Sequence, residues 1–205
     1  EWPQDEAAWS QANDRASLLQ TRFAALGSTL VSGIGPTDVG SPDGAKSLAS
    51  YAMPRVVSNV SLEGATLASH RIVELTSEGI TWKVGVSTVV DPSLPGTDGL
   101  GEVGDPVAAT KEIVAAMKKG GADFTVVMAQ GGRAFAETVA GATEGLDLVV
   151  VGIPEGVDRQ RLGAPAAHAG GTYILEPGTQ LQTVTELVLS VDATAGSVPA
   201  LSAWT

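Results

Sequence analysis

Hydrophobic positions along the chain follow two periods, and these periods separate predicted helices from predicted strands. In residues 5–26, apolar side chains recur at spacings of three and four, which is the repeat of an amphipathic helix. The stripe consists of Trp9, Ala12, Ala16, Leu19, Phe23 and Leu26. Gly27 is a suitable C-terminal cap, so the pattern predicts a leading helix within residues 1–27. Its stripe either packs on the chain's own sheet or binds a partner.

A helix–strand–helix–strand unit is predicted over residues 105–156. Residues 124–128 and 146–151 are near-continuous apolar runs of strand length, which is typical of parallel strands covered on both faces. The residues at the ends of these strands, 128–132 and 151–155, should lie at the edge where an open α/β sheet binds its ligands.

The first helix of this unit has clear end signals. Asp105 is a suitable N-cap, and Pro106 fits the first helical turn because it needs no N–H partner there. Gly120 and Gly121 end the helix. The apolar side chains that share one arc of it are Val107, Ile113, Val114 and Met117.

Strand-like alternation appears before and after this unit. Residues 70–75 and 80–86 flank a turn with a glycine, which predicts a β-hairpin. The other short strands are predicted at residues 28–34, 55–60, 172–176 and 184–191, and residues 91–104 are predicted to be a long loop. Together these elements predict one α/β domain over residues 1–192, with a mixed sheet and helices on both faces. Residues 193–205 read as a C-terminal tail or linker.

Composition narrows the possible functions. The 205 residues carry a formal net charge of -11, which repels nucleic acid and anionic lipid. No apolar run approaches the roughly 18 to 20 residues needed to span a bilayer. The chain has no cysteine and only two histidines, His70 and His168. Thiolate chemistry is therefore excluded, and few general-base or metal-binding hypotheses remain.

Several short motifs, taken in order over residues 18–192, resemble the second half of the catalytic domain of calcineurin-like metallophosphoesterases, in the 5'-nucleotidase branch. In the first part, they are Ala25-Leu26-Gly27, Gly35-Pro36-Thr37-Asp38, Val57-Ser58-Asn59-Val60, the hairpin strand at residues 80–86, and Asp105-Pro106-Val107. In the second part, Ala129-Gln130-Gly131-Gly132 resembles the family's Ser-His-Leu-Gly, and Gly152-Ile153-Pro154-Glu155 resembles its Gly-His-Ser-His.

The resemblance implies a site in which histidine, asparagine and aspartate hold two metal cations. This chain departs from that pattern at five positions. Pro36 replaces a ligand asparagine, Thr37 replaces a histidine that assists the leaving group, and Gln130 replaces a ligand histidine. Ile153 and Glu155 replace the last histidine pair. The family's first ligands, in Asp-x-His and Gly-Asp motifs, have no match in residues 1–16.

We therefore expect no catalytic residue, no resident metal and no cofactor. The positions of the former site would be Pro36, Thr37, Asp38, Asn59, Gln130, Gly152, Ile153 and Glu155. One alternative is that Asp38, Gln130 and Glu155 converge and hold Ca²⁺ or Mg²⁺ through oxygen; the other is that they are solvated strand ends.

Two further signals have a functional and a structural interpretation. Gly131 and Gly132, opening a helix after a strand, would suit an anion at the helix N-terminus, or simply form a turn. His70 and His168 are interpreted as surface or packing residues. No Ser-His-Asp arrangement is supported by spacing.

These observations favour a non-catalytic structural or interaction module within a larger, exported assembly, in the periplasm or outside the cell. The expected partner is another protein or a sister subunit, and the candidate contact residues are Trp9, Ala12, Ala16, Leu19 and Phe23. The competing hypothesis is a metal-dependent phosphomonoesterase or 5'-nucleotidase-like hydrolase, completed by a segment or chain outside this sequence. A third hypothesis, a small nucleotide-like ligand in the former site, is less favoured.

Overall fold

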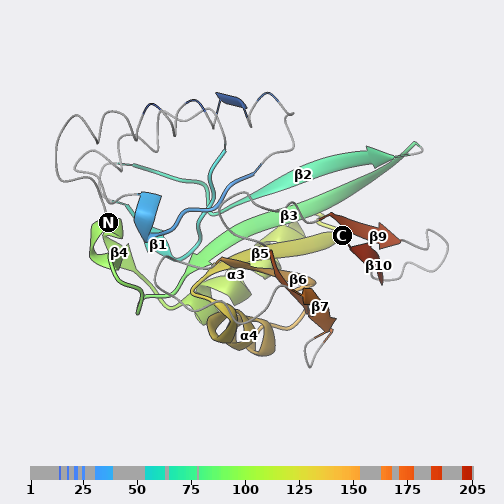
Figure 1. The fold of residues 1–205 in the computed structure, drawn as a ribbon. Coiled ribbons are helices and arrows are strands. Elements are labelled where there is room, and N and C mark those ends of the chain that lie inside the picture. Colours follow the sequence, from blue (N-terminus) through green and yellow to red (C-terminus); the bar gives the residue numbers. More distant parts are fainter. Residues whose placement is uncertain are drawn as a thin grey trace.

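The chain folds around one mixed β-sheet with helices packed on it (Figure 1). The computed structural model describes residues 14, 18, 21–22, 25, 31–38, 54–62, 65–77, 79–152, 163–167, 171–177, 186–190 and 200–204. Its helices are η1 (Pro36–Asp38), η2 (Thr97–Leu100), α3 (Pro106–Lys119) and α4 (Arg133–Ala142). Its strands are β1 (Val60–Ser61), β2 (His70–Ser77), β3 (Ile80–Val90), β4 (Glu102–Val103), β5 (Phe124–Gln130), β6 (Leu148–Gly152), β7 (Gly163–Ala167), β8 (Tyr173–Glu176), β9 (Leu187–Ser190) and β10 (Ala200–Trp204).

The main sheet has the strand order β2-β3-β5-β6-β8-β7. Strands β3, β5, β6 and β8 are parallel, while β2 and β7 pair antiparallel at the two edges. The predicted hairpin is confirmed as β2 and β3, and the two apolar runs are confirmed as the adjacent parallel strands β5 and β6. The predicted α/β fold with a mixed sheet is thus confirmed.

The predicted end signals of α3 are also confirmed. The Asp105 carboxylate accepts hydrogen bonds from the N–H groups of Val107 and Ala108, and Pro106 occupies the first helical position. On the apolar arc, Ile113, Val114 and Met117 are buried.

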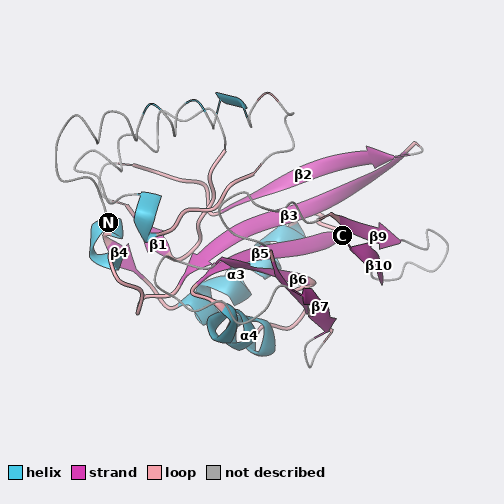
Figure 2. Cartoon of the chain, in the orientation of Figure 1, coloured by secondary structure: helices cyan, strands magenta, loops and turns pink. Residues whose placement is uncertain are grey.

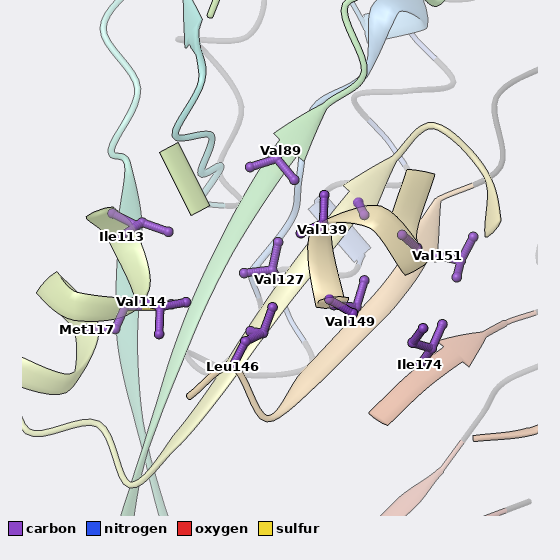
Figure 3. Close-up of a cluster of buried hydrophobic side chains, with 13 residues drawn as sticks. Val89, Ile113, Val114, Met117, Val127, Val139, Leu146, Val149, Val151 and Ile174 are labelled. Atoms are coloured by element: carbon purple, nitrogen blue, oxygen red, sulfur yellow. The ribbon is translucent and has the colours of Figure 1, made fainter. Parts of the chain in front are cut away.

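One apolar core joins both helices to one face of the sheet. Figure 3 shows α3 side chains and Val139 of α4 lying against side chains of the central strands. The sheet residues in this core are Val89, Val127, Ala129, Val149, Val151 and Ile174. Gly85 of β3 permits the close approach of α3, because a Cβ there would lie 2.7 Å from Met117 Sδ. Figure 2 shows α3 and α4 on the same side of the sheet.

The opposite face of the sheet carries a second apolar cluster. Phe124, Leu148 and Leu175 are buried there, and Leu187 of β9 packs against them. Strand β9 pairs with β10, so residues 200–204 form a strand at the end of the stretch whose composition predicts a tail or linker. In the register of this pair, Leu201 lies opposite Leu189 and Trp204 lies opposite Leu187.

A third cluster lies under the segment between β3 and α3. This segment is predicted as a loop without periodicity, yet it contains η2 and β4, and its Leu94 and Leu100 are buried. They pack with Ile34, Val57 and Val90. Two isolated leucines give no periodic signal, which is why the sequence pattern suggests an open loop. The segment is part of the core.

Candidate functional site

The carboxyl ends of three parallel strands form one row, and the predicted site positions Gln130 and Gly152 lie on it. Val90 ends β3 and pairs with Gln130 at the end of β5, which in turn pairs with Gly152 at the end of β6. In Figure 1 these ends point toward the side of the molecule where β1 and β4 lie. This row is the edge where open α/β sheets bind their ligands.

The Gln130 side chain lies across the neighbouring strand end. Its amide is in contact with Gly152, where a Cβ would overlap the Gln130 Oε1 atom. The amide also lies near Gly35, where an added Cβ would be 3.7 Å from Oε1. The structure therefore brings Gln130, Gly152 and the turn that starts at Gly35 together.

Asp38 closes that turn. Its Oδ2 atom accepts a hydrogen bond from Gly35 N–H at 2.8 Å, and its own N–H donates to Gly35 O at 3.0 Å. Its Oδ1 atom accepts from Arg55 Nη1 at 2.7 Å. The Arg55 side chain is 6% exposed and that of Asp38 is 30% exposed, so this ion pair is largely shielded from water.

Pro36 is buried in η1 and has no polar side-chain atom to offer the site. Thr37 belongs to the same short helix, but its side chain is outside the described part. Ile153, Glu155 and His168 lie outside the described residues, as do the stripe residues Trp9, Ala12, Ala16, Leu19 and Phe23.

The Asn59 side chain is buried, and every polar atom in it has a partner. Its Nδ2 atom donates to Val90 O at 2.7 Å and to Gly104 O at 3.1 Å, while its Oδ1 atom accepts from Val90 N–H at 2.9 Å. These bonds tie the segment before β1 to the end of β3 and to the entry into α3. Asn59 therefore acts as a structural clamp.

The two glycines after β5 form a turn. The N–H groups of Gly131 and Gly132 both donate to Gly152 O, at 3.2 and 3.0 Å. Gly132 has a φ of 81°, a conformation that favours glycine. Because both N–H groups already have an acceptor, the structural interpretation of this pair fits better than the anion site.

Sequence reasoning does not identify an ion-pair network beside this row. Glu176, at the end of β8, has a side chain only 2% exposed, and Arg133 Nη1 lies 3.4 Å from its Oε2 atom. Arg133 Nε also donates to Glu137 Oε1 at 2.9 Å. The one available signal is that Glu176 ends an apolar strand at the ligand-binding edge.

A surface pocket of about 360 Å³ opens beside Asn59, near the start of α3. Its lining includes the carboxylates of Glu102, Asp105 and Glu112 and no basic side chain. The acidic lining disfavours a phosphate-bearing ligand.

These residues do not fit a dinuclear metal centre. In the described part of the chain, no three His, Cys, Asp or Glu side chains are placed to hold a metal ion. His70 lies at the start of β2, and its Nδ1 atom is 3.1 Å from Ser69 Oγ. Cations that activate water in such sites need several imidazole or carboxylate ligands with free lone pairs. At this edge, the Asn59 amide is fully hydrogen-bonded, the Asp38 carboxylate is ion-paired with Arg55, and the Gln130 side chain packs against Gly152.

Comparisons with known proteins support the fold. No family model and no curated protein sequence matches the chain. Among similar solved structures, a candidate 5'-nucleotidase from Staphylococcus aureus has a TM-score of 0.61 and 18% identity, covering 92% of this chain and 39% of its own. NAD nucleotidase from Haemophilus influenzae has a TM-score of 0.64 and 14% identity, covering 85% and 38%. The calcineurin-like phosphoesterase YfkN from Bacillus subtilis has a TM-score of 0.61 and 20% identity, covering 86% and 60%.

The chain thus has the α/β fold found in part of these nucleotidases and calcineurin-like phosphoesterases, and the resemblance in the sequence motifs is confirmed at the level of the fold. It spans 38% to 60% of the length of these three proteins. Among the described helices, none is long and apolar enough to cross a membrane.

Proposed function

We propose that this chain is a non-catalytic module with a phosphoesterase-like fold that serves a structural or interaction role in a larger, exported assembly. One observation carries the proposal: the polar side chains at the ligand-binding edge are engaged by the protein itself. Asp38 is held by Arg55 and Gly35, Asn59 by Val90 and Gly104. These bonds take up part of the acceptor capacity of both side chains and fix them in place, which disfavours their use as ligands for a metal or a phosphoryl group.

The sheet surface supports an interaction role. Leu75 and Ile80, near the tip of the β2–β3 hairpin, are 45% and 44% exposed. The register places both on the face that also carries Trp82 and Val84. Large apolar side chains grouped on a strand pair favour contact with another protein surface. The expected partner is another protein or a sister subunit, and the resemblance to 5'-nucleotidases favours a periplasmic or extracellular setting.

An assay of phosphomonoester hydrolysis tests the catalytic half of the proposal. Purified chain is incubated with p-nitrophenyl phosphate and AMP in the presence of Mn²⁺ or Mg²⁺. We expect no turnover above buffer. Turnover that disappears in Asp38→Asn would contradict the proposal. The interaction half fails if the chain is monomeric and binds no dye that reports apolar surface.

The alternative function is a metal-dependent phosphomonoesterase or 5'-nucleotidase-like hydrolase completed by a segment or chain outside this sequence. The observation that favours it is the length of the similar structures, of which this chain covers 39%, 38% and 60%. Such an enzyme would need Asp38 released from Arg55. A third possibility, a nucleotide-like ligand in the former site, predicts a rise in Tm with AMP.

A further inference from the structure

Arg55 brings a buried positive charge to the place where the fold leads one to expect metal cations. Its guanidinium lies 2.7 Å from Asp38 Oδ1, and the other oxygen of the same carboxylate accepts the Gly35 N–H. Gly35 in turn faces the Gln130 amide. One carboxylate oxygen near the former site is therefore paired with a cation that is part of the protein.

We propose that Arg55 is the permanent internal cation of this site, and that it prevents divalent metal ions from binding at Asp38. This inference rests on the proposed non-catalytic function, because both concern the same strand ends. It goes further by naming the residue that excludes the metal.

Electrostatic repulsion disfavours a second cation here. A guanidinium is a fixed positive charge under the conditions in which proteins are folded. A metal ion bound to Asp38 would lie close to this fixed positive charge, and repulsion between like charges is strong where water is excluded. The Arg55 side chain is only 6% exposed, so it is poorly placed to swing into solvent and make room.

The available ligands also make Asp38 the position that matters. Mg²⁺ can be held by one or two carboxylates together with several waters. The amide oxygen of Asn59 already accepts the Val90 N–H. Within the described residues, Asp38 supplies the carboxylate of this turn, and Arg55 is paired with it.

The experiment measures the Tm of the wild-type chain in EDTA and in millimolar Mn²⁺, Mg²⁺ or Ca²⁺. The proposal predicts no metal-dependent shift that depends on Asp38. A metal present at about 100 times its Kd would raise Tm by roughly 5 to 10 °C. Such a rise in the wild type, lost in Asp38→Asn, would overturn the proposal.

Variants test whether Arg55 is the cause. Arg55→Met keeps the length of the side chain and removes its charge, and we expect its Tm in EDTA to fall by about 3 to 8 °C. In Mn²⁺ we expect this variant to recover part of the loss, and the recovery should vanish in Arg55→Met/Asp38→Asn. A folded Arg55→Met that gains no response to metal would refute the role of Arg55. If that variant does not fold, the wild-type measurement decides.

The control is Arg71→Met, which removes one positive charge from an exposed position of β2, outside the Arg55–Asp38 pair. It should gain no metal response. A parallel phosphatase assay separates the two proposals. Turnover without a metal response at Asp38 contradicts the non-catalytic function alone, whereas a metal response without turnover contradicts this inference alone.

Discussion

Arg55 and Asp38 are separated by 17 residues in the sequence and form an ion pair 2.7 Å long between Nη1 and Oδ1. Asp38 ends the described segment 31–38, and Arg55 lies at the start of the described segment 54–62. Ser32 and Arg55 form a parallel β-bridge that joins these two segments. Asp38, which the resemblance in the sequence places near a metal centre, is therefore held by an arginine of the chain itself.

The first prediction concerns the turn that Asp38 closes. Asp38→Ala removes the acceptor for both Arg55 and Gly35, so we expect a loss of about 1 to 3 kcal/mol in the free energy of unfolding. Urea denaturation measures it. Asp98→Ala, at an exposed aspartate of η2, is the matched control and should change stability by less than about 0.5 kcal/mol. Equal effects of the two substitutions would show that the turn does not depend on Asp38.

The second prediction concerns the Asn59 clamp. Asn59→Ala leaves Val90 and Gly104 backbone groups without their side-chain partner, and we expect a loss of about 2 to 4 kcal/mol. Asn59→Asp keeps the acceptor and loses the donor, so it should also destabilise the fold. The exposed Ser61→Ala is the control. A loss below about 0.5 kcal/mol for Asn59→Ala would contradict the clamp.

The third prediction concerns the contact between Gln130 and Gly152. A Cβ at position 152 would overlap the end of the flexible Gln130 side chain, which must shift to make room, so Gly152→Ala should cost about 0.5 to 1.5 kcal/mol. Shortening the opposing side chain should relieve this overlap, so Gln130→Ala/Gly152→Ala should recover at least half of the loss. Additive effects in this double-mutant cycle would show that the two side chains do not meet.

The fourth prediction concerns the network at the end of β8. Arg133→Met removes a cation from the buried Glu176 carboxylate and should cost about 1 to 3 kcal/mol. Glu137→Gln removes only the exposed partner of the same arginine, and its effect should stay below about 0.5 kcal/mol. The order of the two effects, measured by urea denaturation, is the test, and the reverse order would refute the network.

The fifth prediction concerns the exposed hairpin face. Leu75→Ser and Ile80→Ser should reduce the binding of an apolar-surface dye and weaken association of the chain with its partner or with itself. Because each residue is 44% to 45% exposed, each substitution should cost about 1 kcal/mol, less than at a fully buried position. Thr76→Ala, which alternates to the other face of β2, is the control. Unchanged dye binding in both serine variants would show that this face of the hairpin is not the exposed apolar surface that contacts a partner.

The sequence predicts the local elements well where one physical signal acts alone. The Asp105 cap and Pro106 mark the start of α3, and the alternation on either side of the turn predicts the β2–β3 hairpin. The near-continuous apolar runs predict β5 and β6 as buried parallel strands. Each of these signals lies within a few neighbouring residues.

The relationships that decide the site are long-range, and the pattern does not contain them. Nothing near Arg55 indicates that its partner is Asp38, and nothing near Asn59 indicates that its amide holds Val90 and Gly104. A helical stripe shows which side of a helix is buried but not which face of the sheet it covers. The structure supplies the partners of Asp38 and Asn59, which the sequence pattern leaves open.

The most direct test of the non-catalytic function is the rate of p-nitrophenyl phosphate hydrolysis by the purified full chain in millimolar Mn²⁺, compared with Asp38→Asn under the same conditions. The account predicts that both rates equal the rate in buffer alone. A wild-type rate clearly above buffer, which falls to the buffer rate in a folded Asp38→Asn variant, would contradict it.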